Sequence, residues 1–263
     1  MIILKSPSEI AVMKIAGSIL AAVLEELRAV IRPGISLVEL DRRAEQKTRQ
    51  FNAIPAFKGY NGFPASLCAS VNEEVVHGIP GSRILKNGDI IGLDFGVIYQ
   101  NFYADSAITV PVGTISDEAK KLIQVTEEAL YKGIHQAKAG NRLYDISGSI
   151  QQYVESNGFS VVRDFVGHGI GRKMHEAPQI PNFVGNDFNP VLKLGMVLAI
   201  EPMVNIGTYE VDVDTKDNWT VRTVDGKYSA HFEHTVAVND NGPEILTVLR
   251  PELLPKVQDD YHS

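Results

Sequence analysis

An internal duplication is the feature of this sequence that most constrains its fold. The segment Leu85–Asp94 is echoed by the segment Leu192–Glu201, so an aspartate that ends the first copy matches a glutamate that ends the second. A duplicated fold brings equivalent positions together about a pseudo-two-fold axis, so matched polar residues are expected to converge there. The matched pairs are Asp94 with Glu201, Asp105 with Glu233, and His77 with His168.

The duplication extends to two pairs of expected helices. Ser6-Pro7-Ser8-Glu9 combines an N-cap serine, a proline and a third-position glutamate, which predicts a helix that ends at Pro33-Gly34. Ser36-Leu37-Val38-Glu39 predicts a second capping box and a helix to about Phe51. The second pair is expected from Ser116 to about Lys138 and from Leu143 to about Asn157.

Short β-rich runs separated by turn signals follow each helical pair. Lys86-Asn87-Gly88-Asp89 and Asn241-Gly242 are two of these turns. Strands that pair locally and carry helices on one face predict an α+β fold with an antiparallel-rich sheet covered by two pairs of helices. Because no Pro-, Gly- or Ser-rich linker separates the halves, we expect a single domain over residues 1–263, with halves of about 5–113 and 114–250 and a polar tail over 251–263.

Composition and charge narrow the functional classes. The formal net charge of -7 argues against nucleic-acid binding, which needs clustered lysine and arginine. The apolar stretch 10–31 is interrupted by charged residues such as Lys14 and Glu25, so it is not expected to span a membrane. The single cysteine, Cys68, fits a reducing compartment. We therefore expect a cytoplasmic protein with neither a membrane nor a nucleic-acid partner.

The duplicated acids predict a metal site. Asp94 and Glu201 end apolar runs and are followed by further apolar residues, so both are expected to be buried, where an unpaired charge costs several kcal/mol. Four neighbouring carboxylates cannot all stay ionised without compensation, and two divalent cations would supply it. An oxygen-rich set with imidazole suits Mn²⁺, Fe²⁺, Co²⁺ or Zn²⁺, and the sequence does not choose among them.

Other motifs favour structural interpretations. His175-Glu176-Ala177-Pro178-Gln179 begins like a zinc-peptidase helix, but Gln179 replaces the second histidine and Pro178 would break the helix. Cys68 has no evident partner that would orient it as a nucleophile, which favours a small buried or pocket-lining residue. An acidic cluster around Asp214 lacks the glycine and glutamate of a calcium loop and predicts a solvated hairpin.

The remaining histidines divide into two groups. His135 and His262 are expected at the surface, on a helix and in the tail. His231 precedes Glu233 by two residues on an expected strand and so shares its face, which favours a supporting role beside the ligands. His234 points the other way and is expected to be structural.

The motifs together resemble the methionine aminopeptidases, specifically the compact bacterial type I enzymes. The resemblance covers nearly the whole chain in a fixed order of short matches. These matches are Asn61-Gly62-Phe63-Pro64, Ser70-Val71-Asn72-Glu73, His77-Gly78-Ile79-Pro80, Gly167-His168-Gly169-Ile170-Gly171, Ile200-Glu201-Pro202-Met203-Val204 and Phe232-Glu233-His234-Thr235. The resemblance implies the "pita-bread" α+β fold with an internal pseudo-two-fold axis. It also implies metal-assisted removal of an N-terminal methionine.

The resemblance assigns roles to particular residues. It implies five ligands of a two-metal site, with Asp105 and Glu233 bridging the ions; the ligands are Asp94, Asp105, His168, Glu201 and Glu233. His77 and His175 would contact the substrate, and Glu201 would also shuttle a proton. The methionine pocket would be lined by Tyr60, Phe63, Cys68, Met174 and Trp219. Met174 and Phe57 stand where relatives often carry other residues.

The resemblance also implies substrates and partners. We expect N-termini of newly made, deformylated polypeptides with a small uncharged second residue, acted on by a monomer, and transient contact with the ribosome stays open. Prolidases and Xaa-Pro aminopeptidases, which share the fold and a similar metal set, are the nearest enzymatic rival. A binding protein that has lost catalysis is disfavoured because all five ligands and both histidines are present.

Overall fold

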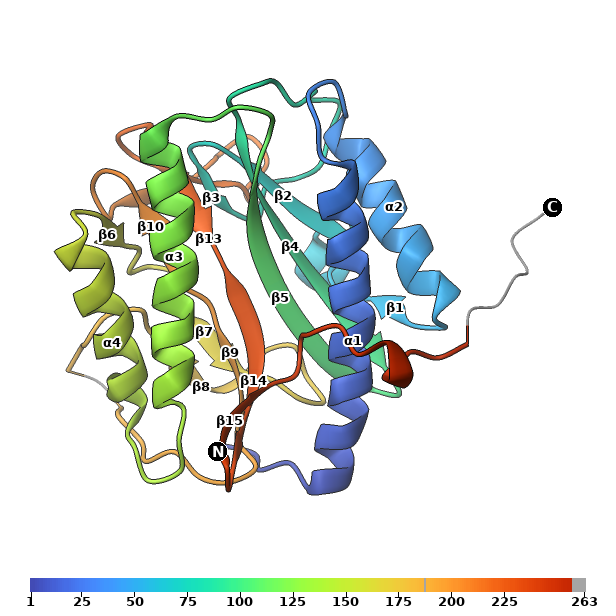
Figure 1. Cartoon of the computed structure of the whole chain (residues 1–263), viewed down its shortest axis with the longest axis vertical. Coiled ribbons are helices and arrows are strands. Elements are labelled where there is room, and N and C mark those ends of the chain that lie inside the picture. The colour runs from blue at the N-terminus through green and yellow to red at the C-terminus, as the bar shows by residue number, and fades with distance from the viewer. Residues whose placement is uncertain (187, 257–263) are drawn as a thin grey trace.

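One twisted antiparallel sheet with helices packed on one face forms the body of the molecule (Figure 1). The fold is that of a computed structural model, which describes residues 1–186 and 188–256. Within that part of the chain, α1 (Pro7–Val30) and α2 (Leu37–Gln50) cover one half of the sheet. The other half is covered by α3 (Asp117–Gln136) and α4 (Leu143–Ser156). This arrangement confirms the predicted fold class and the two helical pairs.

The two predicted capping boxes have different outcomes. At α1 the Ser6 Oγ accepts from the Glu9 amide at 3.3 Å, and the Ser6 amide donates to the Glu9 carboxylate at 2.9 Å, which confirms the box. At α2 the prediction is wrong, because Ser36 makes no side-chain cap. The Glu39 carboxylate instead binds Arg42 and Arg43, and the Leu37 amide donates to the Arg83 carbonyl at 3.0 Å.

The main sheet has nine strands in the order β1-β4-β5-β14-β9-β7-β8, with β2 added to β4 and β15 to β14. Two three-stranded sheets, β13-β10-β6 and β11-β12-β3, complete the described fold. The strands are β1 (Ile54–Pro55), β2 (Leu67–Val71), β3 (Glu74–Val76), β4 (Ile90–Tyr99), β5 (Phe102–Pro111), β6 (Ser160–Val161), β7 (Gly167–Gly169), β8 (Glu176–Ile180), β9 (Val197–Ile200), β10 (Met203–Asn205), β11 (Val211–Val213), β12 (Val221–Thr223), β13 (Ser229–His231), β14 (Glu233–Asn239) and β15 (Gly242–Ile245). Of two 3₁₀ turns, η1 (Tyr60–Gly62) lies between β1 and β2, and η2 (Pro251–Leu253) follows β15.

Strand alternation separates an apolar face of the sheet from a polar one. Leu93 and Phe95 on β4 are fully buried in the core formed with α1 and α2, whereas Asp94 between them points to the opposite face. Leu198 and Val236 lie in the corresponding core with α3 and α4. Burial of each such side chain stabilises the fold by about 1.5–3 kcal/mol. The register of acids is therefore fixed by the hydrophobic positions beside them.

The strand ladders show how the two halves correspond. In the first half Ser70, Gly92 and Thr109 form one row across β2, β4 and β5. In the second half the matching row is His168, Ala199 and Thr235 across β7, β9 and β14. Asp94 lies two residues after Gly92, and Glu201 lies two residues after Ala199. The two acids therefore correspond, in agreement with the predicted pair. His168, however, corresponds to Ser70, so its predicted equivalence with His77 is wrong.

The predicted pairing of Asp105 with Glu233 is also wrong, by two residues. The Thr109 Oγ1 accepts from the His231 amide at 2.9 Å and donates to its carbonyl at 2.8 Å. The Thr235 Oγ1 makes the same two bonds with Asp105, at 3.0 and 2.8 Å. Asp105 therefore corresponds to His231, and Glu233 to Ala107. A shift of two residues keeps every side chain on the same face, so the sequence pattern fits both alignments.

The expected C-terminal tail is partly structured. Its first residues form η2, and the Arg250 amide just before it donates to Ser18 Oγ at 2.8 Å. Residues 257–263, including His262, lie outside the described residues. No helix in the described part of the chain is long and apolar enough to cross a membrane.

Candidate metal centre

The ladders bring the acids of both halves to one place on the polar face of the sheet. Asp94 on β4 lies opposite Ala107 on β5, and Ala107 in turn lies opposite Glu233 on β14. Asp105 shares the face of Ala107 because it is two residues away. Glu201 directly follows Ile200, which pairs with His234, the residue after Glu233. The four carboxylates thus meet at the seam between β5 and β14.

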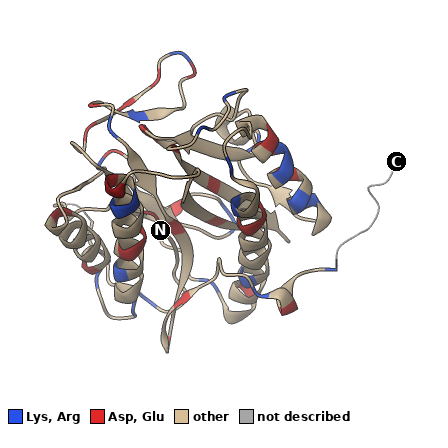
Figure 2. Ribbon diagram, turned by 45° about the horizontal axis from the view of Figure 1, so that its top comes forward, with Lys and Arg blue, Asp and Glu red and all other residues tan. Residues whose placement is uncertain are grey.

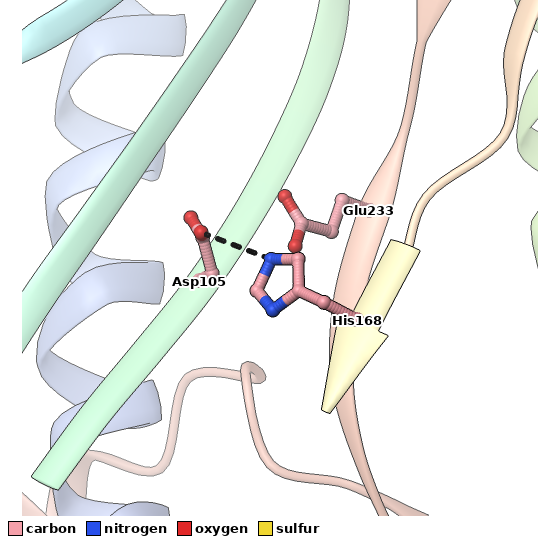
Figure 3. A group of neighbouring side chains, drawn as sticks. All are labelled: Asp105, His168 and Glu233. Atoms are coloured by element: carbon pink, nitrogen blue, oxygen red, sulfur yellow. Dashed lines mark ion pairs between the residues drawn. The ribbon is translucent and has the colours of Figure 1, made fainter. Parts of the chain in front are cut away.

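His168 projects from β7 into this group. Its Nε2 atom lies 3.6 Å from Glu201 Oε1 and 4.0 Å from Asp105 Oδ2. One potential ligand atom from each of Asp105, His168 and Glu233 lies within 4.8 Å of the other two, and Figure 3 shows these side chains pointing toward one another. Figure 2 shows acidic positions on the central strands, apart from the mixed charges along the helices.

Burial shifts the ionisation of every member of the group. Burial, opposed in part by His231, raises the pKa of Asp94 to about 7, and burial raises the pKa of Glu201 to about 8. The pKa values of Asp105 and Glu233 are raised well above their ordinary range by burial and then by neighbouring carboxylates. Burial and the nearby His175 lower the pKa of His168 to about 4. The protein alone therefore favours neutral carboxylic acids and a neutral imidazole at this place.

Unpartnered oxygen atoms indicate what the group would bind. Asp94 Oδ1, Asp105 Oδ1 and Glu233 Oε1 are buried without a hydrogen-bond partner. Such atoms are rare in folded proteins and are costly unless an ion or water satisfies them. Carboxylate oxygens with one neutral imidazole form the donor set of divalent transition-metal sites. The residues therefore fit bound divalent cations.

A cavity of about 200 Å³ opens above the acids. Every residue predicted as a ligand, substrate contact or pocket residue lines it; these residues are Tyr60, Phe63, Cys68, His77, Asp94, Asp105, His168, Met174, His175, Glu201, Trp219 and Glu233. Phe57 and Asn61 also line it and were absent from the predicted set. Asn61 adopts a left-handed backbone with φ of 48° within η1, a local feature that the sequence pattern did not predict.

The two predicted substrate-contacting histidines stand at the wall of the cavity. The His175 ring lies 4.3 Å from the His168 ring by centroids, and its Nδ1 is 2.7 Å from the Tyr60 hydroxyl. His77 has a φ of 59° and packs edge-on against Trp219 and Phe165. Burial lowers the pKa of His77 to about 4, so it is neutral near neutral pH. Phe165, which fixes this ring, was not predicted.

Cys68 and His234 lie where a structural interpretation places them. Cys68 is opposite Asp94 in the β2–β4 ladder, and burial raises the pKa of its thiol well above the ordinary range, which disfavours a nucleophilic thiolate. His234 Nδ1 is 2.9 Å from Thr247 Oγ1. His135 is exposed on α3, and the acidic cluster around Asp214 forms the predicted β11–β12 hairpin.

Comparison with known proteins agrees with this geometry. The model of metallopeptidase family M24 matches residues 11–240. The methionine aminopeptidase of Clostridium perfringens is 58% identical over 95% of this chain and 100% of that protein. The crystal structure of methionine aminopeptidase from Thermotoga maritima superposes with a TM-score of 0.92 at 48% identity, covering 94% of this chain and 100% of that chain. The chain belongs to metallopeptidase family M24. Within that family its similarity is to the methionine aminopeptidases, as the sequence motifs predicted.

The predicted rival is also a structural neighbour. The Xaa-Pro dipeptidase from Bacillus anthracis superposes with a TM-score of 0.73 at 25% identity. The match covers 96% of this chain but 64% of the dipeptidase chain. The shared fold confirms the predicted pita-bread architecture, and the lower identity favours the aminopeptidases.

Proposed function

We propose that this protein removes the N-terminal methionine from newly made polypeptides by metal-assisted hydrolysis at a two-metal site. The observation that carries the proposal is the group of four carboxylates and one imidazole at the base of the cavity, in which Asp105 and Glu233 are buried, Asp94 and Glu201 are partly buried, and three carboxylate oxygens are unpartnered. The similarity to methionine aminopeptidases over nearly the full length supports the same activity.

The acids and His168 would hold the cations. Asp105 and Glu233 come from the two strands that meet at the seam, so both halves of the chain would hold the cations; the complete set is Asp94, Asp105, His168, Glu201 and Glu233. Bound Mn²⁺, Fe²⁺, Co²⁺ or Zn²⁺ would supply the positive charge that lowers the pKa of water and polarises the scissile carbonyl.

The side chains around the cations would position substrate and move protons. His175 would donate a hydrogen bond to the carbonyl oxygen as negative charge develops on it, because Tyr60 engages its Nδ1 and leaves Nε2 free. His77 would contact the scissile amide and assist departure of the amine. The Glu201 carboxylate would accept a proton from the attacking water and pass it to the leaving amine.

The cavity suits a methionine side chain. Phe63 and Trp219 pack edge-on at 5.2 Å between centroids, and Cys68 adds a polarisable sulfur. An aromatic and sulfur-lined slot favours a flexible thioether. The predicted pocket residues are therefore assigned to the first residue of the substrate; they are Tyr60, Phe63, Cys68, Met174 and Trp219.

The limited volume of the cavity also supports selectivity for the α-amine and for the second residue of the substrate. A free amine near the buried carboxylates would be favoured, so a formylated N-terminus would be refused, and a small uncharged second residue would be preferred. A monomeric state and transient ribosome contact remain predictions from the resemblance, and a cytoplasmic location remains a prediction from the composition.

A peptide assay tests the proposal. Metal-free protein is supplied stepwise with Mn²⁺, Fe²⁺, Co²⁺ or Zn²⁺ and given Met-Ala-Ser, formyl-Met-Ala-Ser and Met-Lys-Ser. Release of methionine from the first peptide alone is expected. Cleavage of Xaa-Pro peptides in place of Met-Ala-Ser would favour the prolidase-like rival.

Asp105→Asn tests the two-metal assignment. The change removes one anionic oxygen from the seam, so calorimetric titration should find fewer bound cations, and methionine release should cease. Because the amide is neutral, the metal-free variant should remain folded. Full activity in this variant would exclude the assignment.

A further inference from the structure

His231 is a buried histidine that is neither in the proposed ligand set nor among the residues that line the cavity. Its side chain is 3% exposed, and its Nε2 atom has no hydrogen-bond partner in the described structure. Nε2 lies 3.7 Å from Glu201 Oε2. A buried polar atom left without a partner is uncommon, so a neighbouring acceptor is expected to engage it.

The backbone of His231 is held firmly. Its amide and carbonyl both bond to Thr109 Oγ1, at 2.9 and 2.8 Å, and it pairs with Met203 across β13 and β10. Since β10 begins two residues after Glu201, one small sheet anchors both residues. The ring therefore has a fixed direction toward the Glu201 carboxylate.

The pseudo-two-fold correspondence adds a second observation. His231 occupies in the second half the position that Asp105 occupies in the first, with the same pair of threonine bonds. Duplication thus placed a polar side chain at this point on both sides of the seam. One side is an acid of the proposed metal set, and the other is an imidazole.

The surroundings of the ring favour a donor at Nε2. Glu201 is the acid nearest to the ring, Asp94 interacts with the ring electrostatically, and His77 is the neighbouring imidazole. An imidazole N–H can donate to a carboxylate oxygen, and such a bond fixes the orientation of a ligating carboxylate. A shift of less than 1 Å would bring Nε2 and Oε2 to bonding distance.

We propose that His231 is a positioning residue that donates from Nε2–H to Oε2 of Glu201. This inference rests on the proposed function, in which Glu201 both holds a cation and carries a proton. The hydrogen bond would keep the carboxylate from rotating and leave Oε1, which lies 3.6 Å from His168 Nε2, available to hold a cation. His231 thereby acts through Glu201 and touches neither substrate nor cation.

Two amide substitutions separate this role from simple packing. In His231→Gln the side-chain amide reaches the position of Nε2, whereas in His231→Asn it reaches only that of Nδ1. Both replacements are neutral and polar. We expect kcat for Met-Ala-Ser to stay within about threefold in the glutamine variant and to fall at least about tenfold in the asparagine variant, with KM nearly unchanged. His135→Gln, on the exposed face of α3, is the matched control.

Two further measurements do not depend on turnover. Nitrogen NMR of histidine-labelled, Zn²⁺-loaded protein should show a protonated Nε2 for His231, and calorimetry should find the same number of cations bound in both variants. An unprotonated Nε2, equal kcat in the two variants, or loss of one cation in the asparagine variant would overturn the proposal. If the unmodified protein releases no methionine, the proposed function fails, and the NMR result alone then decides the role of His231.

Discussion

The Tyr60 hydroxyl lies 2.7 Å from His175 Nδ1, and the two rings are 5.4 Å apart by centroids. Tyr60 belongs to η1, and His175 directly precedes β8, so the contact joins the two halves across the mouth of the cavity. If the hydroxyl donates to Nδ1, the imidazole carries its proton on Nε2 and presents it to the cavity.

Tyr60→Phe should therefore slow catalysis without unfolding the protein. The ring stays in place, but His175 loses the partner that sets its tautomer, so kcat should fall about threefold to tenfold. Steady-state kinetics on Met-Ala-Ser measures this, and circular dichroism checks the fold. An unchanged kcat would show that the contact does not orient His175.

A buried ion pair anchors the segment that carries Met174 and His175. Lys5 Nζ lies 2.7 Å from Glu176 Oε2, and both side chains are 3% exposed. Glu176→Gln alone leaves an unpaired buried ammonium and should destabilise the protein by about 3–5 kcal/mol. In Lys5→Met/Glu176→Gln no charge is stranded, so the double variant should lose less than the sum of the single changes, as measured by urea unfolding.

The exposed pair Lys120–Asp117, at 2.8 Å on α3, provides the comparison. A double-mutant cycle there should give a coupling of less than about 1 kcal/mol. Equal coupling at the two pairs would contradict the structural role assigned to Lys5.

Without bound cations, the stability of the folded protein should fall as the pH rises from neutral to about 9. Burial raises the pKa of Asp94 to about 7 and that of Glu201 to about 8, so the metal-free folded state holds more protons than the unfolded chain. Stability is then lost as pH rises through these folded values. His77 and His168, whose pKa values burial lowers to about 4, are neutral in both states above about pH 7.5 and do not oppose the trend.

Urea unfolding of metal-free protein at about pH 7.5 and about pH 9 should thus show a loss of at least about 1 kcal/mol. Saturation with cations should weaken this dependence, because bound carboxylates are already ionised, and cation binding at neutral pH should release protons. A metal-free stability that is constant or increases over this interval would contradict the burial of the acids.

Gly17 allows α1 to approach the segment after β15. A Cβ at this position would lie 2.3 Å from the Leu246 carbonyl oxygen, so Gly17→Ala should destabilise the protein by about 1–3 kcal/mol. Gly148→Ala on α4 meets only Val184 Cγ2 at 3.3 Å and should be neutral or stabilising. Thermal unfolding of both variants measures the difference.

Much of the fold follows from local sequence rules. The α1 capping box and the helix ends near Pro33 and Gly140 are properties of a few adjacent residues, and the hydrophobic alternation around Asp94 fixes its face. These features need no knowledge of distant contacts. Ser36 differs because its backbone forms a β-bridge with Ile84, a residue distant in the sequence, and its side chain does not cap α2. Local rules could not predict this contact.

The exact correspondence between halves could not be predicted from local pattern. A displacement of two residues preserves both the alternation and the resemblance of Asp105 to Glu233, and only the threonine bonds across the seam distinguish the alternatives. Phe165 and Asn61 were missed for a similar reason, because their roles arise from a ring contact and a left-handed backbone.

The seam between β5 and β14 is short, with Glu233 opposite Ala107 and His234 opposite Ser106 as its paired residues. Each half contributes acids that repel one another once they ionise, so at alkaline pH the join is weakest in the absence of cations. If the backbone were cut near the exposed Gly113, the two pieces would still be joined by this seam and by the β3–β12 pairing, and we expect bound cations to strengthen the seam. The ions would then act as a reversible crosslink between two ancestral halves of one sheet.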